Sequence, residues 1–313
     1  MSTIFNLQDV ESLLLRDKFK ILEGICTEYI FIEDIMIKNG AYKNYSTGWW
    51  AVPNPRKYGD YLLFKVSNND PTENDHKIFR HFTNNGTQAY FVLYYNKELW
   101  VLDMNNYYDN LFKNKELPSY KKIWDFLKDN NYYHQNRPPL LANKEVRNEE
   151  RQKRCIEFLK RKGVLHDVAL QRYFANYILT VYFKFPINID GFYVKDNQIR
   201  LYEIKYKYPA ANGCYGLNKG FVKLFKWIIK NNIDIYHFVL HNGTRDENIT
   251  VLDAIENESI QDKCEWRLCQ INTDKLNTDE SLSPSKTQIE GEREQKVIYI
   301  PQNDFKTLKT LFS

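Results

Sequence analysis

The spacing of apolar and polar residues changes along the chain, and its clearest strand pattern lies between residues 188 and 207. This stretch predicts two strands joined by a tight polar turn at 195–197. The first strand carries Asp190, and the second carries Glu203 and Lys205. Side chains two apart on a strand share a face, so Glu203 and Lys205 are expected to be neighbours, with Asp190 facing them from the adjoining strand.

The pattern then changes to a helical period. Residues 217–230 place apolar side chains on one side of a predicted helix and four lysines on the other. The apolar side holds Phe221, Leu224, Phe225 and Ile228, and the lysines are Lys219, Lys223, Lys226 and Lys230. Residues 233–241 have the β-branched and aromatic content of a buried strand. The order strand, strand, helix, strand predicts an α/β protein.

The N-terminal region has a related order of elements. Strands are predicted within 48–66, a helix at 74–82, strands at 89–95 and 99–104, and a helix at 119–130. Asp60, Phe64 and Lys65 precede the helix at 74–82, but Leu63 stands where Glu203 would be. Two interpretations remain open: an ancient duplication whose first copy lost its carboxylate, or ordinary α/β architecture.

Two consecutive prolines within residues 135–143 mark the expected domain boundary. They divide the chain into an N-terminal α/β region, 1–138, and a C-terminal domain, 139–313. Helices are predicted at 7–22, 145–162 and 166–183, while the apolar segment 29–37 fits a helix or a strand. The polar tract 272–295 is expected to be a mobile loop. A strand at 297–300 and a helix at 304–312 are expected to end the chain.

Composition bounds the class of protein. The 313 residues are 43% hydrophobic and 27% charged, which is typical of a globular protein with a sizeable core. The net charge of +4 is small, so any affinity for nucleic acid has to come from local patches. We find no secretory signal pattern and no apolar run long enough to span a membrane. The five scattered cysteines are expected to be reduced thiols of a cytoplasmic protein.

Two carboxylates and a lysine at one sheet edge suit a divalent cation. Carboxylates about 4 Å apart repel by roughly 4 kcal/mol at an effective dielectric constant near 20, and a bound cation removes that penalty. Mg²⁺ fits because it takes one or two carboxylates and completes its shell with water and phosphate oxygens. The sequence lacks the motifs of zinc peptidases, P-loop enzymes, dinucleotide-binding proteins and α/β-hydrolases. A glycosidase with paired carboxylates is disfavoured by Lys205 and the basic helix.

The spacing of Asp190 from Glu203-Ile204-Lys205 resembles the D-x(n)-E-x-K motif of the PD-(D/E)xK nuclease superfamily. This resemblance implies a restriction-endonuclease-like fold, which is a mixed sheet flanked by helices. It also implies Mg²⁺ held by Asp190, Glu203 and the Ile204 carbonyl, with Mn²⁺ able to substitute. Lys205 would then lie beside the attacking water or the scissile phosphate. The proline that the family normally has before the aspartate is replaced by Ile189.

The family often carries one more acidic residue or a glutamine on the helix before this strand. Asp167, Gln171, Glu157 and Glu150 are the candidates in this chain. Gln171 is favoured because it lies within the helix that leads into the Asp190 strand.

Basic and aromatic residues are the candidates for binding nucleic acid. Lys207 and the helix lysines Lys219, Lys223, Lys226 and Lys230 could each neutralise a phosphate, and a solvated surface is the competing interpretation. Aromatic residues of the N-terminal region could stack on bases, although most are expected in the core. They include Trp49, Trp50, Tyr58, Tyr90, Tyr94, Tyr95, Tyr107 and Tyr108.

The expected function is a Mg²⁺-dependent endodeoxyribonuclease acting on double-stranded DNA, with a type II restriction endonuclease as its expected form. Cutting both strands of a symmetric site requires two active sites, which predicts a homodimer. One alternative is a nucleic-acid-binding module whose nuclease fold has lost catalysis. Another is a junction resolvase or repair nuclease of the same fold. In each case the N-terminal region would recognise or position the nucleic acid.

Overall fold

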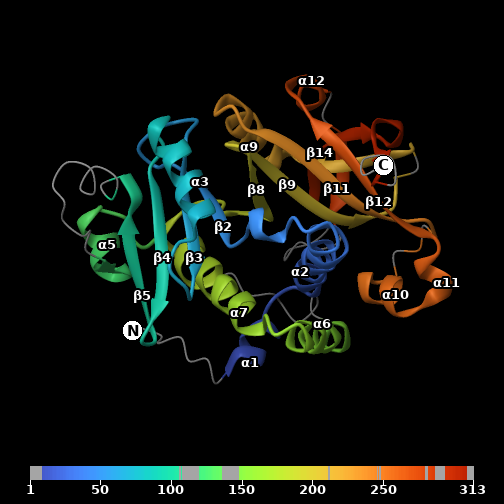
Figure 1. The fold of residues 1–313 in the computed structure, drawn as a ribbon, viewed down its shortest axis with the longest axis horizontal. Coiled ribbons are helices and arrows are strands. Elements are labelled where there is room, and N and C mark those ends of the chain that lie inside the picture. Colours follow the sequence, from blue (N-terminus) through green and yellow to red (C-terminus); the bar gives the residue numbers. More distant parts are fainter. Residues whose placement is uncertain are drawn as a thin grey trace. The chain divides into compact units, whose positions relative to one another are not determined.

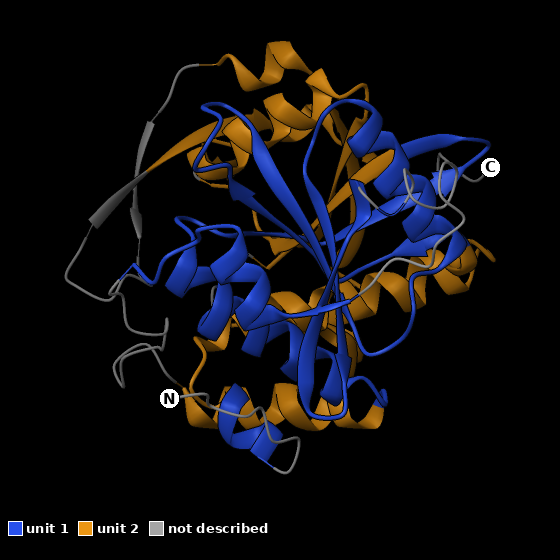
Figure 2. Ribbon diagram, turned by 90° about the vertical axis from the view of Figure 1, so that its left-hand side faces the viewer, with its two compact units in different colours: residues 1–14, 44–141, 162–199 blue, residues 15–43, 142–161, 200–313 orange. Residues whose placement is uncertain are grey.

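Strands and helices alternate along the chain, which confirms the α/β class. The computed structural model describes residues 9–105, 107, 120–135, 148–210, 212–244, 246, 248–278, 281–285 and 293–308. The chain forms two compact units, coloured separately in Figure 2. Unit 1 comprises residues 1–14, 44–141 and 162–199, and unit 2 comprises 15–43, 142–161 and 200–313. The units therefore interleave along the sequence, whereas the expected boundary at 138 lies outside the described residues.

The main sheet of unit 1 has the strand order β6-β5-β4-β3-β2-β7. Its strands are β2 (Trp49–Pro53), β3 (Tyr61–Ser67), β4 (Ala89–Tyr95), β5 (Glu98–Asp103), β6 (Lys121–Lys122) and β7 (Ile187–Ile189). Strands β3 and β4 are parallel and lie side by side in Figure 1, and their connection contains α3 (Glu73–Asn84). The other pairs are antiparallel. Thus β3, α3 and β4 form a parallel βαβ unit.

Helices cover this sheet through apolar side chains at helical spacing. They are α1 (Val10–Leu14), α3, α5 (Ile123–Asp129), α7 (Leu165–Tyr173), the π-helix η5 (Phe174–Leu179) and α8 (Thr180–Tyr182). Thr72 begins α3 with a reciprocal capping box to Asp75, and Ile78, Phe79 and Phe82 are buried. The η5 ring of Phe174 lies 5.9 Å from the ring of Phe64 on β3.

A second pairing in unit 1 joins β1 (Tyr45–Ser46) to β8 (Gly191–Lys195), antiparallel. The ring of Tyr45 occupies the space where a side chain at residue 191 would start, because a Cβ there would lie 2.2 Å from the ring. A side chain at residue 191 would therefore have to displace the ring of Tyr45. After β8 the chain turns at Asp196 and Asn197, which have φ of 50° and 62° and form the tight turn expected from the sequence.

Unit 2 contains a four-strand arrangement in the order β9-β11-β12-β15. The strands are β9 (Gln198–Lys207), β11 (Asp234–Asn242), β12 (Cys264–Ile271) and β15 (Lys306–Thr307). Strands β9 and β11 are parallel, and β11 and β12 are antiparallel (Figure 1). A second sheet has the order β10-β14-β13, formed by β10 (Cys214–Asn218), β14 (Arg293–Pro301) and β13 (Ser281–Ser285).

The helices of unit 2 are α2 (Phe19–Phe31), the π-helix η2 (Ile32–Ile37), α6 (Glu149–Arg161), α9 (Lys219–Lys230), α10 (Val251–Glu256), α11 (Glu258–Gln261) and α12 (Thr273–Leu276). In unit 2, α2 packs against α6 and α10, while α9 packs against β10, β11 and β14. Phe31 at the end of α2 packs against Phe238 of β11, with ring centroids 4.7 Å apart. Short 3₁₀ turns are η3 (Tyr42–Asn44) and η6 (Gln302–Asp304).

Several sequence predictions were wrong in detail. The expected helix at 7–22 is divided into α1 and α2, and the ambiguous segment 29–37 is helical. The tract 272–295, expected to be a loop, contains α12, β13 and the start of β14, because backbone pairing does not require an apolar pattern. The expected C-terminal helix begins instead with η6 and β15, and residues 309–312 lie outside the described part. Among the helices of the described ranges, none has the length and apolar character needed to cross a membrane.

Candidate active site

Glu203 and Lys205 lie on the same face of β9, as predicted. Oε1 of Glu203 is 2.6 Å from Nζ of Lys205, and the side chain of Glu203 is 1% exposed whereas that of Lys205 is 28% exposed. The carboxylate is therefore buried and the ammonium is open on one side. The alternative of an ordinary solvated strand face does not describe this pair, because burying a carboxylate costs free energy that a surface pair never bears.

The surroundings of Lys205 also include α9 and the strand backbone. Its Nζ lies 5.5 Å from the ring centroid of Phe221 in the first turn of α9, and it donates to the carbonyl oxygen of Ile204 at 3.0 Å. The Ile204 carbonyl, predicted as a metal ligand, thus lies at the same place as the lysine ammonium.

His237 is a part of this cluster that sequence reasoning missed. It pairs with Glu203 in the parallel register of β9 and β11, and its Nδ1 lies 3.2 Å from the carbonyl oxygen of Glu203. A carbonyl only accepts, so Nδ1 carries the hydrogen and Nε2 presents a lone pair. Nε2 is buried without a hydrogen-bond partner among the described residues. Burial, with Lys207 nearby, lowers the pKa of His237 to about 3, so the ring is neutral at neutral pH.

Lys207 completes the row of side chains on this face of β9. Its ammonium donates to the carbonyl oxygen of Gly216 in β10. Burial lowers the pKa of Lys207 to about 8. The positive charge of Lys205 also lowers this pKa, and the negative charge of Glu203 raises it by a smaller amount. The prediction that Lys207 adjoins the Glu203–Lys205 pair is supported, and it is not a plain surface lysine.

Helix α9 has the two faces expected from the sequence. Leu224, Phe225 and Ile228 are buried, and Phe221 is half-buried. Lys223, Lys226 and Lys230 are exposed and Lys219 is half-exposed. The first turn of α9 contains no acidic residue. This helix presents a row of positive charge; its contact with nucleic acid stays a prediction.

Asp190 belongs to unit 1, where it lies between β7 and β8. Its side chain is 3% exposed, and Oδ1 accepts a hydrogen bond from Nδ2 of Asn188 at 3.2 Å. The hydroxyl of Tyr45 donates to the Asp190 carbonyl at 3.2 Å. Since Glu203 and Lys205 belong to unit 2, the convergence of Asp190 with them stays a prediction.

The favoured helix residue, Gln171, also lies in unit 1. Its Nε2 is 3.6 Å from the position that a Cβ at Gly48 would take. Asp167, one turn earlier on α7, has a pKa raised by burial, and the nearby charge of Lys65 partly offsets this effect. Helix α7 therefore faces the segment around Gly48 and Lys65. The other two candidates, Glu150 and Glu157, are exposed on α6 in unit 2.

Lys65 forms a second buried ion pair, in unit 1. Its Nζ lies 3.2 Å from Oδ1 of Asp75 in α3, accompanied by the Ser46 hydroxyl at 3.1 Å and the Thr47 carbonyl. The Ser46 hydroxyl in turn donates to Oδ1 of Asp75 at 2.5 Å. Burial lowers the pKa of Lys65 despite the attraction of Asp75. Burial also raises the pKa of Asp75, but Lys65, Ser46 and Thr72 outweigh it and hold that pKa below its ordinary value.

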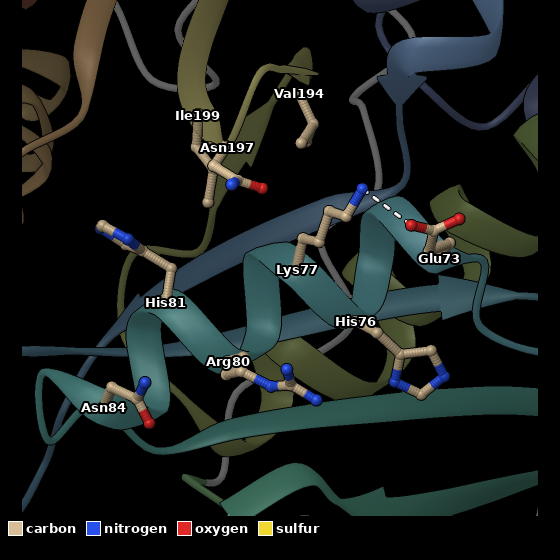
Figure 3. Close-up of a pocket in the computed structure, with 9 residues that line it drawn as sticks. All are labelled: Glu73, His76, Lys77, Arg80, His81, Asn84, Val194, Asn197 and Ile199. Carbon is tan, nitrogen blue, oxygen red and sulfur yellow. Dashed lines mark ion pairs between the residues drawn. The ribbon is translucent and has the colours of Figure 1, made fainter.

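A pocket of about 400 Å³ lies in unit 1 between α3 and the β8–β9 turn (Figure 3). Figure 3 shows Lys77 and His81 projecting from α3 toward the residues of that turn, and Lys77 pairs with Glu73 at 2.8 Å. No residue predicted from the sequence as catalytic or metal-binding lines it. Its lining is Glu73, His76, Lys77, Arg80, His81, Asn84, Val194, Asn197 and Ile199.

The aromatic residues of the N-terminal region are mostly structural. Trp49, Trp50, Tyr90 and Tyr94 are buried. Tyr58 and Tyr95 are exposed and Tyr107 is half-buried, while Tyr108 lies outside the described residues.

Comparisons with known proteins give no family for this chain. No family model matches it, no curated protein is similar to it, and no solved structure resembles it. Within the described residues there is no group of three or more His, Cys, Asp or Glu side chains able to hold a metal. Function must therefore be argued from the site itself.

Proposed function

We propose that this protein is a Mg²⁺-dependent endodeoxyribonuclease with a restriction-endonuclease-like core, acting on double-stranded DNA in the manner of a type II restriction enzyme. One observation carries the proposal: a buried glutamate, Glu203, lies 2.6 Å from a partly open lysine, Lys205, on a strand that leads toward a lysine-rich helix. A buried carboxylate beside two lysines and a neutral histidine is the kind of perturbed ionisable cluster that is common at functional sites.

The order of elements supports the core assignment. In unit 2, β9 is followed by β10, by α9 and then by β11, which is parallel to β9, and β12 pairs antiparallel with β11. Helix α9 packs its apolar face inward and leaves its lysines accessible. A mixed sheet with an acidic residue and a lysine two apart on a central strand is what the nuclease family requires.

The proposed metal site combines Asp190, Glu203 and the Ile204 carbonyl. The proposal requires that the two-residue turn at Asp196–Asn197 sets the register between the strand segments on either side of it. If the pairing continues outward from that turn, Asp190 lies opposite Glu203. The donor set fits Mg²⁺, which prefers carboxylate and carbonyl oxygens and keeps several waters. Mn²⁺ is expected to substitute because it accepts the same oxygen donors.

The roles of the side chains follow from their chemistry. A metal bound there would polarise the phosphate and lower the pKa of a bound water. Lys205 would stabilise the negative charge that develops on the phosphate, because its ammonium is held in place by Glu203 and Phe221. Lys223, Lys226 and Lys230 would bind the DNA backbone, and Lys219 would extend that row. The pocket lined by Lys77 and Arg80 supports a DNA-positioning role for unit 1.

Cleavage assays with matched variants test this proposal. Purified protein is incubated with supercoiled and linear DNA in Mg²⁺, Mn²⁺ or EDTA. We expect cleavage that EDTA abolishes and that falls at least 100-fold in Lys205→Met and Glu203→Gln, as on removal of one transition-state-stabilising group. Lys263→Met is the control, because Lys263 is exposed and lies before β12. Wild-type rates in Lys205→Met would disprove the catalytic assignment.

A second candidate is a nucleic-acid-binding module without catalysis. It is favoured by the Glu203–Lys205 pair itself, since a carboxylate already neutralised at 2.6 Å does not need a metal. A mobility shift without cleavage, lost when the α9 lysines are changed, would support it. Cutting confined to branched DNA would instead identify a junction resolvase or repair nuclease.

A further inference from the structure

The two halves of the chain repeat one order of elements. In the first half a helix runs into a π-helix, and after the short turn η3 the chain continues with β1, β2, β3, α3, β4 and β5. In the second half a helix runs into a π-helix and the short helix α8, and the chain continues with β7, β8, β9, α9, β11 and β12. The second half has two insertions in this order, β10 before α9 and the helices α10 and α11 before β12. The pairings repeat as well: β3–β4 and β9–β11 are parallel, while β4–β5 and β11–β12 are antiparallel.

The two π-helices argue against a chance similarity between the two halves. Both η2 and η5 have six residues, and each follows an α-helix and precedes the first strand of its half. Residues in π-helices are well under about 1% of globular proteins. Two of equal length at the same place in the same order of elements indicate descent from one ancestral half.

Lys65 of β3 and Lys205 of β9 occupy equivalent places, but the residues that they contact differ. Helices α3 and α9 each have 12 residues, and their third residues are Asp75 and Phe221. Lys65 pairs with Asp75 at 3.2 Å, whereas Lys205 lies over the ring of Phe221 at 5.5 Å. On the strands, Glu203 stands two residues before its lysine, and Leu63 stands two residues before the other. In the first half, the carboxylate beside the lysine therefore comes from the helix, whereas in the second half it comes from the strand.

The halves also exchange structural elements. Within unit 1, the first-half strands β1 and β2 pair antiparallel with the second-half strands β8 and β7, and both pairings keep the same register, from Tyr45 opposite Tyr193 to Ala51 opposite Ile187. The second-half residue Phe174 packs on Phe64 of the first half. Within unit 2, Phe31 of the first half packs on Phe238 of the second. Each half therefore supplies helix and strand to the sheet of the other, as in two subunits that have swapped elements.

We propose that this chain is a fused, element-swapped duplicate with a single hydrolytic centre, and that as a monomer it cuts the two strands of duplex DNA one at a time, through a nicked intermediate. The inference rests on the proposed nuclease function. Of the two equivalent strands, β9 carries a carboxylate two residues before its partly exposed lysine, whereas β3 has Leu63 at that place and its lysine, Lys65, is buried against Asp75. Hydrolysis at one centre breaks one P–O bond and adds water across it, leaving one phosphomonoester and one hydroxyl in that strand. The first half then serves to position the duplex.

The exchange of elements between the halves has a test that does not depend on catalysis. A protease site is inserted between residues 140 and 141 of the full chain, and the folded protein is cut there. We expect the fragments to elute together as one species of unchanged size and to separate only in denaturant, because each completes a sheet of the other. Elution as two separate species in native buffer would overturn the swap. A second insertion, between residues 144 and 145, serves if the first variant melts below the parent.

The single centre is tested with supercoiled plasmid and Mg²⁺. We expect open circles to accumulate before linear DNA, at a rate that rises in proportion to protein concentration. Linear DNA without an open-circle intermediate, formed at a rate rising with the square of protein concentration, would overturn the single centre and support the homodimer instead. If the wild-type protein cuts neither strand with Mg²⁺ or Mn²⁺, the proposed function and the nicked intermediate both fail, while the co-elution result still decides whether the halves exchange elements.

Discussion

Lys207 shows how one half-buried residue can couple stability to pH. Its ammonium donates to the Gly216 carbonyl, and its burial beside Lys205 disfavours the protonated form. The same burial that makes the cluster suitable for binding an anion makes the charged lysine costly in the empty protein. A phosphate bound beside Lys207 would therefore stabilise the charged lysine and offset the free-energy cost of that charge in the folded protein.

This cost predicts a pH-dependent stability. The pKa of Lys207 is about 8 in the folded state against an ordinary 10.5, so between these values the unfolded state binds more protons. The free energy of unfolding therefore rises with pH from 8 to 10.5, by up to about 3 kcal/mol, and this contribution is constant below pH 8. Urea unfolding across pH 7 to 10.5 measures it.

Lys207→Met is expected to remove most of this slope, and Lys263→Met, the exposed control, to retain it. A variant lacking Lys207 with the wild-type slope would show that another group titrates there.

At the scale of the element, α9 is the helix whose chemistry was readable from the sequence. Its apolar side is buried and its lysines are accessible, so the helix should tolerate loss of charge without loss of fold. We expect Lys223→Gln combined with Lys226→Gln to leave the circular dichroism spectrum and melting temperature nearly unchanged. The slope of log K for DNA binding against log salt should fall by about 1.8, since each phosphate contact contributes about 0.9.

The matched control replaces two exposed lysines of another helix, Lys153 and Lys160 of α6, by glutamine. We expect that variant to keep the wild-type salt dependence. An equal fall of this slope in both variants would mean that the overall positive charge, rather than α9, attracts the DNA.

Local patterns predicted the elements better than their partners. The alternation around Glu203 and the spacing of α9 gave strand, helix and facing side chains correctly, because both depend on neighbouring residues. His237 was missed because its role depends on a parallel pairing with Glu203 that has no local signal. The π-helices were missed because their wider turn breaks the period expected of a helix. Gln171 lies in a helix, as predicted, but that helix lies beside Gly48 in unit 1.

At the scale of the whole molecule, the interleaved segments predict that a mutation acts far from its place in the sequence. Phe31 belongs to the N-terminal part of the chain but packs on strands of unit 2. Phe31→Ala removes a fully buried ring and is expected to cost about 3 to 5 kcal/mol. Hydrogen exchange should show the loss of protection in β11 and β12 rather than in β3 to β5.

Phe82→Ala is the comparison, because Phe82 is equally buried in α3 and packs on Phe192 within unit 1. Its effect should appear in the strands of unit 1. If Phe31→Ala weakened the strands nearest to it in sequence instead, the described exchange of helices would be wrong.

The pairing of β2 with β7 has a consequence for synthesis on the ribosome. Trp49, Trp50 and Ala51 leave the exit tunnel about 140 residues before the strand that covers them. At translation speeds of about 5 to 20 residues per second, this apolar edge waits roughly 7 to 30 seconds for its partner. An edge of this kind invites association between nascent chains. A low concentration of nascent chains, or a chaperone that holds the growing polypeptide, should therefore raise the yield of native protein.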